Sequence, residues 1–147
     1  MSERGLENVD YVDTFITVSP DSSAVAASEP QPRGGKPTVA SATYDMIASA
    51  PYRHRSSDVI FTVWADRQGI PEAEREARWA EFFGVGRACL RSSDLPKRYG
   101  WGVHADGDGR LALYPIGSAE YESLAAGRSP RDGAPVTVRA GMRSSRA

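Results

Sequence analysis

The chain has 147 residues, of which 40% are hydrophobic and 25% are charged. This length is typical of one domain, so two full domains are not expected. The 18 basic and 19 acidic residues give a formal net charge of -1, which provides no general reason to expect a nucleic acid or an anionic membrane as the partner. The single cysteine, Cys89, excludes an internal disulfide framework.

The sequence contains no apolar run close to the roughly 20 residues of a membrane helix. Its first ten residues are acidic and lack the apolar centre of a signal peptide. Since a lone cysteine also fits a reducing compartment, we expect a cytoplasmic protein without a membrane partner.

Charge is distributed unevenly along the chain. Residues 1–30 carry six acidic side chains against one arginine, whereas residues 128–147 carry five arginines against one aspartate. We therefore expect an acidic, potentially disordered leader over residues 1–10, one domain over 11–127, and a basic, partly flexible extension over 128–147.

The first half of the chain predicts two strands and two helices. Residues 11–18 are rich in β-branched and aromatic side chains and predict a strand, and residues 19–37 form a long loop rich in proline and serine. Thr38 caps a helix that ends before Pro51. Residues 57–66 are apolar at odd and even positions alike, which predicts a central strand covered on both faces. A second helix begins at Pro71, and its first turn is acidic.

The second half predicts further strands and one short helix. Strands are expected over residues 87–91, 99–105 and 110–114, and a weaker one over 136–139. An Asp-Gly-Asp-Gly turn joins the second and third of these, and a helix capped by Ser118 precedes the last. The order of elements predicts one α+β domain, with a mostly antiparallel or mixed sheet of about five to six strands and two to three helices.

The stretch Lys97-Arg98-Tyr99-Gly100-Trp101-Gly102-Val103-His104, together with residues 11–15, 58–61 and 89–92, resembles a family of small, single-domain bacterial proteins catalogued as a domain of unknown function. The resemblance covers most of the chain. It implies a stand-alone domain and assigns no activity, cofactor or site residue.

If residues 97–104 form a strand, Tyr99 and Trp101 lie on one face with Lys97. A basic residue followed by alternating aromatics partly imitates the strands on which RNA-binding domains stack bases. RNA or single-stranded DNA binding through Tyr99, Trp101, Lys97 and the C-terminal arginines is therefore one alternative. It is not favoured, because large aromatic rings usually pack in a core and the surface is not generally basic.

Gly100 and Gly102 fall on the other face of that strand, with Arg98 and His104. Glycine is expected in a strand where another backbone, a packed helix or a ligand comes close. The leading hypothesis is a non-catalytic module that binds a small molecule or a protein through the 19–37 loop and the 89–104 segment. Its candidate binding residues are Arg91, Lys97, Arg98, Tyr99, Gly100, Trp101 and Gly102.

Cys89 and His104 are candidate catalytic residues. If residues 87–91 and 99–105 pair as a hairpin, the two side chains share a face on a diagonal. Cys89 would then act as a nucleophile, His104 as its base, and Arg91 would stabilise negative charge. A register slip of one residue separates the pair, and a buried cysteine with a structural histidine is the commoner arrangement. The sequence leaves the enzymatic and non-catalytic alternatives open.

Neither a metal nor a cofactor is expected. The turn that begins at Asp106 resembles the start of a calcium loop, but Arg110 and Gly117 stand where an EF-hand needs ligands. The chain also has no phosphate loop or dinucleotide-binding motif.

Overall fold

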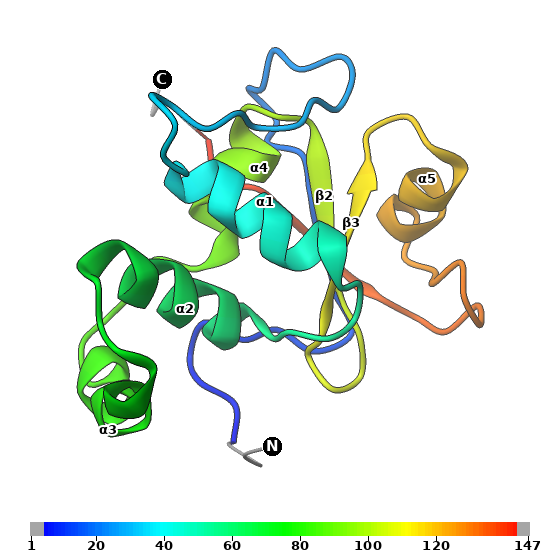
Figure 1. Cartoon of the computed structure of the whole chain (residues 1–147). Helices are drawn as coiled ribbons and strands as arrows, with labels where there is room; N and C mark the ends of the chain where they lie inside the picture. The colour runs from blue at the N-terminus through cyan, green and yellow to red at the C-terminus, as the bar shows by residue number, and fades with distance from the viewer. Residues whose placement is uncertain (1–4, 144–147) are drawn as a thin grey trace.

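A mixed sheet with the strand order β3-β2-β1-β4 lies at the centre of the computed structural model, which describes residues 5–143 (Figure 1). β1 pairs antiparallel with β2 and parallel with β4, and β2 pairs antiparallel with β3. The four strands are β1 Thr14–Thr17, β2 Trp101–Ala105, β3 Leu111–Pro115 and β4 Thr137–Ala140.

Helices cover both faces of this sheet. α1 and α4 pack on one face, α2 packs on α1, and α3 packs on the outer side of α2. α5 covers the other face, against β1 and β3. The helices are α1 Val39–Ser49, α2 Ser56–Gln68, α3 Glu72–Phe83, α4 Asp94–Lys97 and α5 Ala119–Ala125, with a 3-10 turn at Leu90–Ser92. The predicted α+β class is confirmed, whereas the described sheet has fewer strands and the fold more helices than predicted.

Helices with clear capping signals form where the sequence predicts them. The Thr38 hydroxyl accepts the backbone N–H of Ser41 at 3.0 Å, and the Ser118 hydroxyl accepts that of Tyr121 at 3.1 Å. Each bond satisfies a donor that the helix itself leaves unpaired. The turn between β2 and β3 also forms as expected, with the Gly109 N–H donating to the Asp106 carbonyl at 3.0 Å.

The strand predicted over residues 57–66 is wrong, because this segment is the helix α2. Its buried side chains face in two directions. Val59 and Val63 join the core under the sheet, while Phe61 and Ala65 pack against α3. A helix covered on two sides is apolar at odd and even positions alike, so it gives the same pattern as a buried strand. The sequence did contain one indication of a helix, the glycine at position 69. Gly69 ends α2 in the left-handed conformation, with a φ of 69°.

The strand predicted over residues 87–91 is also wrong. This segment runs from the end of α3 into the 3-10 turn and pairs with no strand in the described part of the chain. The hairpin expected between residues 87–91 and 99–105 is therefore absent, and β2 instead lies between β1 and β3.

The two glycines of the 97–104 segment are approached by the chain itself. A Cβ at Gly102 would collide with the Phe15 ring and lie 2.8 Å from the ring of Tyr121, which belongs to α5. Gly100 has a positive φ of 77°, and a Cβ there would lie 2.7 Å from the carbonyl oxygen of Ala26. A ligand over these glycines, as the leading hypothesis allowed, has no room.

The described parts of the two chain ends pack onto the domain. Val9 is buried, and the Asp10 carboxylate accepts both the backbone N–H and the hydroxyl of Ser57, each at 2.8 Å. At the other end β4 joins the sheet, and the Met142 N–H donates to the Arg91 carbonyl at 2.7 Å. The rest of the expected leader and extension, including Arg146, lies outside the described residues.

Within residues 5–143, none of the helices combines the length and hydrophobicity that a membrane crossing requires. The same residues hold no group of three or more histidine, cysteine or acidic side chains arranged for a metal ion.

The Gly102→Ala variant should be less stable by about 1–3 kcal/mol, because the added methyl group must displace the buried rings of Phe15 and Tyr121. The midpoint of urea unfolding measures this loss. Gly86→Ala is the matched control, since nothing lies within 4 Å of a Cβ at that position. Equal midpoints for the two variants would contradict this account of the sheet packing.

Candidate functional site

Cys89 and His104 lie on opposite faces of the sheet. Along β2, Val103 and Ala105 point into the core shared with α1 and α2, so His104 between them points to the α5 face. Cys89 lies on the α1 and α2 face, next to the core residue Leu90. The expected nucleophile and base are therefore separated by the sheet and do not form a pair.

Each of the two side chains has a tyrosine partner instead. The Cys89 Sγ lies 3.2 Å from the hydroxyl of Tyr11, which precedes β1. The His104 Nδ1 lies 2.8 Å from the hydroxyl of Tyr52, which follows α1. Burial lowers the pKa of His104, against the opposing effect of Asp106. His104 is only 3% exposed, so the neutral imidazole is the form that the fold favours.

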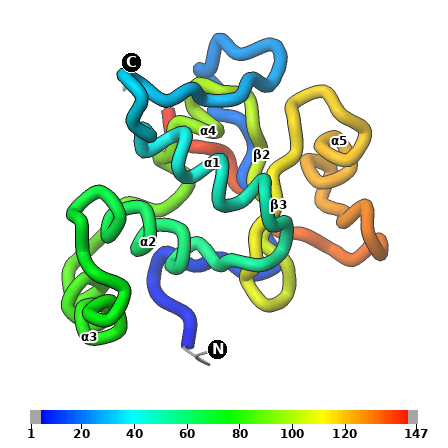
Figure 2. The backbone as a smooth tube through the Cα atoms, in the orientation of Figure 1, coloured from blue at the N-terminus to red at the C-terminus, as the bar shows by residue number. Residues whose placement is uncertain are grey.

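The aromatic pair proposed for stacking bases is held by the protein. The Trp101 indole N–H donates to the Ser28 carbonyl at 2.9 Å, and its ring packs on that of Tyr44 with 5.3 Å between centroids. The Tyr99 carbonyl accepts the Ser28 N–H at 2.9 Å. The 19–37 loop, which crosses the top of the molecule in Figure 2, thus docks on this segment.

The basic candidates do not converge on one place. The Arg91 Nε donates to the Ala140 carbonyl at 2.8 Å and so ties the end of β4 to the domain. Lys97 ends α4, and Arg98 pairs with Asp94 across 3.5 Å on the exposed surface. Lys97 and Arg98 thus belong to a helix end rather than to the predicted strand.

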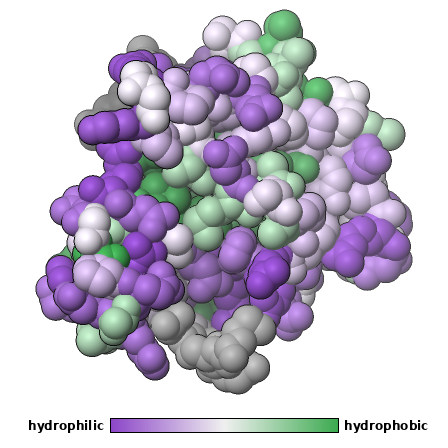
Figure 3. Space-filling view, in the orientation of Figure 1, coloured by the Kyte–Doolittle hydropathy of each residue, from purple (hydrophilic) through white to green (hydrophobic). Residues whose placement is uncertain are grey.

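An apolar recess of about 380 Å³ opens between α1, α2 and the 87–94 segment. In Figure 3 the hydrophobic colour gathers in this hollow between the start of α1 and α2. We call it the Cys89 pocket. Its lining residues are Val39, Ala40, Thr43, Ile60, Val63, Trp64, Phe82, Arg87, Ala88, Cys89, Leu90, Ser92, Ser93 and Asp94.

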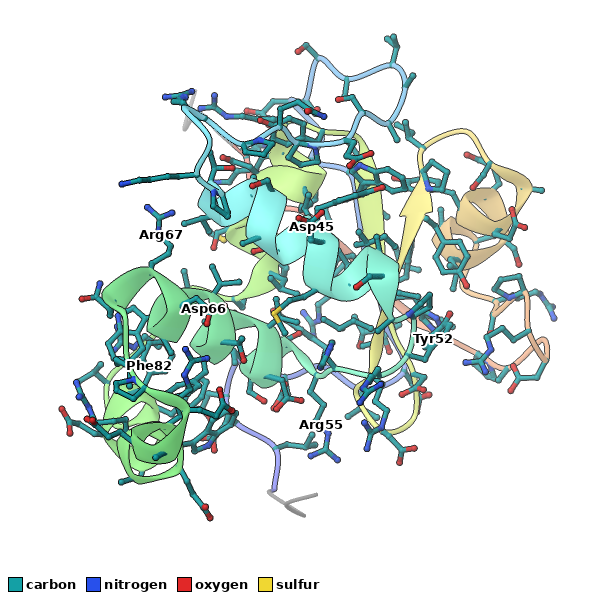
Figure 4. All side chains as sticks on the ribbon, viewed as in Figure 1. Asp45, Tyr52, Arg55, Asp66, Arg67 and Phe82 are labelled. Carbon is teal, nitrogen blue, oxygen red and sulfur yellow. The ribbon has the colours of Figure 1, made fainter. Side chains whose placement is uncertain are left out.

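Several polar side chains line the Cys89 pocket besides its apolar walls. Thr43 is 5% exposed and contributes a hydroxyl to the lining. The Arg87 Nε donates to the Phe82 carbonyl at 2.8 Å, and its guanidinium lies 3.8 Å from the centre of the Phe82 ring. Phe82 itself lies between α3 and α2 (Figure 4). The pocket thus combines an apolar interior with one guanidinium, one thiol, the hydroxyls of Thr43, Ser92 and Ser93, and the carboxylate of Asp94.

Sequence reasoning identified Cys89 but missed the walls of its pocket. Thr43 belongs to α1, Val63 to α2 and Phe82 to α3, and the sequence predicts a buried helix position for Phe82 alone. Only the packing of the three helices turns these positions into one recess. Assigning residues 57–66 to a strand removed the wall that α2 provides.

A model of a family of unknown function, DUF6157, matches residues 6–147 of the chain. This match confirms the resemblance to a family of unknown function and covers the described residues from Leu6 onward. Neither a curated protein nor a solved structure matches the chain.

The His104→Asn variant should leave the alkylation rate of Cys89 by iodoacetamide unchanged within about twofold, because the sheet separates the two side chains. Tyr11→Phe, which removes the group that does contact the thiol, should change the rate. A large loss of reactivity in His104→Asn alone would show that the two residues interact.

The free energy of unfolding should fall as the pH drops below about 6.5, the ordinary pKa of histidine. Since burial lowers the pKa of His104 in the folded protein, the unfolded chain binds the proton first and acid favours unfolding. The slope cannot exceed about 1.4 kcal/mol per pH unit for one group.

Urea unfolding between pH 5 and 8 measures the pH dependence, and His104→Asn should flatten it. Burial also lowers the pKa of His54, the other histidine, but that side chain is only half-buried. His54→Gln should therefore flatten the dependence less. The opposite ranking of the two variants would contradict the burial of a neutral His104.

Proposed function

The chain belongs to the family of unknown function DUF6157, and we propose from its own geometry that it is a non-catalytic module that binds a small, mainly apolar molecule with an anionic group. The observation that carries this proposal is the Cys89 pocket. The cytoplasmic location expected from the sequence is part of the proposal.

The size and composition of the Cys89 pocket support a small molecule as the ligand. Ligand pockets usually enclose about 300–1,000 Å³ and combine hydrophobic walls with a few polar groups. The recess of about 380 Å³ falls in this range, and Val63, Phe82 and Leu90 give it buried apolar walls. A recess of this shape favours a compact ligand over the flat surface of a protein partner.

Arg87 supports an anionic group on that ligand. The side chain is exposed at the mouth of the pocket, and within the described ranges no carboxylate lies within 4 Å of its guanidinium. Its Nε is already bonded to the Phe82 carbonyl, which fixes the direction of the guanidinium plane. The two outer nitrogens then offer donors suited to a carboxylate or sulfonate.

The other hypotheses find less support. Catalysis by Cys89 with His104 as the base needs a contact that the sheet prevents. Base stacking on Trp101 competes with the ring of Tyr44 and with the bond to Ser28.

The fluorescent probe 1-anilinonaphthalene-8-sulfonate, which has two aromatic groups and one anion, should bind the native protein at one saturable site. Ala88→Phe places a ring in the pocket lining and should weaken this binding at least about tenfold, which corresponds to about 1.4 kcal/mol. A fluorescence titration of the folded protein measures both affinities.

Val85→Phe is the matched control, since Val85 is exposed on the same segment but does not line the pocket. It should bind the probe like the parent protein. The bound probe should also slow the alkylation of Cys89, which locates the site independently. The proposal fails if the native protein shows no saturable binding, or if Ala88→Phe binds as tightly as Val85→Phe.

A further inference from the structure

A chain of three hydrogen-bonding side chains ends at His104, on the face of the sheet opposite the Cys89 pocket. The Tyr114 hydroxyl lies 2.7 Å from the Tyr52 hydroxyl, which in turn lies 2.8 Å from the His104 Nδ1. Figure 4 shows Tyr52 just beyond the end of α1, beside β3. The backbone of Tyr52 is fixed there, because its N–H donates to the Leu111 carbonyl at 2.6 Å.

The other ring nitrogen of His104 has no partner within residues 5–143. His104 lines a second pocket of about 380 Å³, which we call the His104 pocket, whereas Tyr52 and Tyr114 do not line it. Since Nδ1 is bonded on the tyrosine side, the Nε2 edge of the ring faces the pocket. A 3% exposed imidazole with one unbonded nitrogen is a polar group directed at a ligand site.

The charges around the His104 pocket are mostly negative. Its lining includes the carboxylates of Asp13, Asp106 and Asp132 against one guanidinium, that of Arg131. Asp106 accepts the N–H groups of Asp108 and Arg110 through one oxygen, both at 2.9 Å, and so stays fixed at the end of β2. This balance of charges favours a cationic ligand over an anion.

Asp13 lines the His104 pocket with an exposed side chain. No hydrogen bond or ion pair to its carboxylate occurs in the part of the chain that the structure describes. Its backbone is held at a φ of 49° between the Asp106 carbonyl, which accepts the Asp13 N–H at 3.0 Å, and the Thr137 N–H. The backbone of Asp13 is thus fixed, and its exposed carboxylate is an unpaired acceptor on the lining of the pocket.

We propose that the His104 pocket binds a small ligand with a protonated primary amine, whose N–H groups donate to the Nε2 of His104 and to the carboxylate of Asp13. An ammonium group has donors only and therefore needs both partners as acceptors. The neutral imidazole and the aspartate supply them, and the remaining carboxylates add long-range attraction.

Amine binding sets the direction of the whole hydrogen-bond chain. Nε2 accepts a hydrogen bond only when the proton of the neutral ring is on Nδ1. Nδ1–H then donates to the Tyr52 oxygen, and the Tyr52 hydroxyl donates to Tyr114. Burial and the bond to Tyr114 raise the pKa of Tyr52 far above its usual value, so its hydroxyl keeps the proton that this direction requires.

The test is a titration of the full-length, nitrogen-15-labelled protein with n-butylamine at pH 8, read from the imidazole nitrogen signals. The chain has two histidines, and His54→Gln assigns the signals of His104. Saturable binding with a shift of His104 to the Nδ1–H tautomer is expected. Neither 1-butanol nor butyrate, at the same ionic strength, should produce this shift.

Asp13→Asn should weaken butylamine binding at least about tenfold, because it removes a charged acceptor. Asparagine tolerates the left-handed conformation of this position, so the variant should fold. Asp45→Asn, at an exposed site on α1, is the matched control and should bind like the parent. The proposal is overturned if butylamine leaves the His104 signals unchanged, if 1-butanol acts in the same way, or if Asp13→Asn binds like Asp45→Asn.

Discussion

The alternation of side chains along β2 places His104 on the face of the sheet opposite the Cys89 pocket. Val103 and Ala105 enter the core beneath α1 and α2, and Gly102 and His104 face α5. Because the strand is internal to the sheet, its two faces cannot share a ligand. The apolar pocket at Cys89 and the polar pocket at His104 are therefore independent sites, and each must be understood from its own chemistry.

The packing at Gly102 links the sheet to the wall of the His104 pocket. The rings of Phe15 and Tyr121 meet edge to face with 5.1 Å between centroids, directly over the glycine. The Tyr121 hydroxyl accepts the Val18 N–H at 2.9 Å, which fixes α5 against β1. The chain then continues into the 128–135 loop, whose Ser129 and Arg131 line the pocket. The glycine thus serves helix packing, and the loop that follows α5 lines the His104 pocket.

Local signals predicted those parts of the fold that local interactions determine. The caps at Thr38 and Ser118 and the turn at Asp106 each satisfy backbone groups a few residues away, so the sequence pattern carries them. α2 was missed because its pattern reflects burial on two sides, against the core under the sheet and against α3. The candidate site was only partly predictable for the same reason: His104 was identified, but its partner Tyr52 lies 52 residues earlier and is brought near by tertiary packing.

The two nitrogens of His104 lie in different surroundings, and this bears on its role. Burying a polar nitrogen without a partner costs about 1–3 kcal/mol relative to a bonded one. At His104, the bond to Tyr52 offsets this cost for Nδ1. Among the described residues, the Ser56 hydroxyl is the one fully buried polar side-chain atom without a partner, so the Nε2 of His104 keeps contact with solvent through the pocket. A donor that enters the pocket therefore exchanges a bond from Nε2 to water for a bond to the ligand, and the charge of the neighbouring carboxylates must supply the net gain.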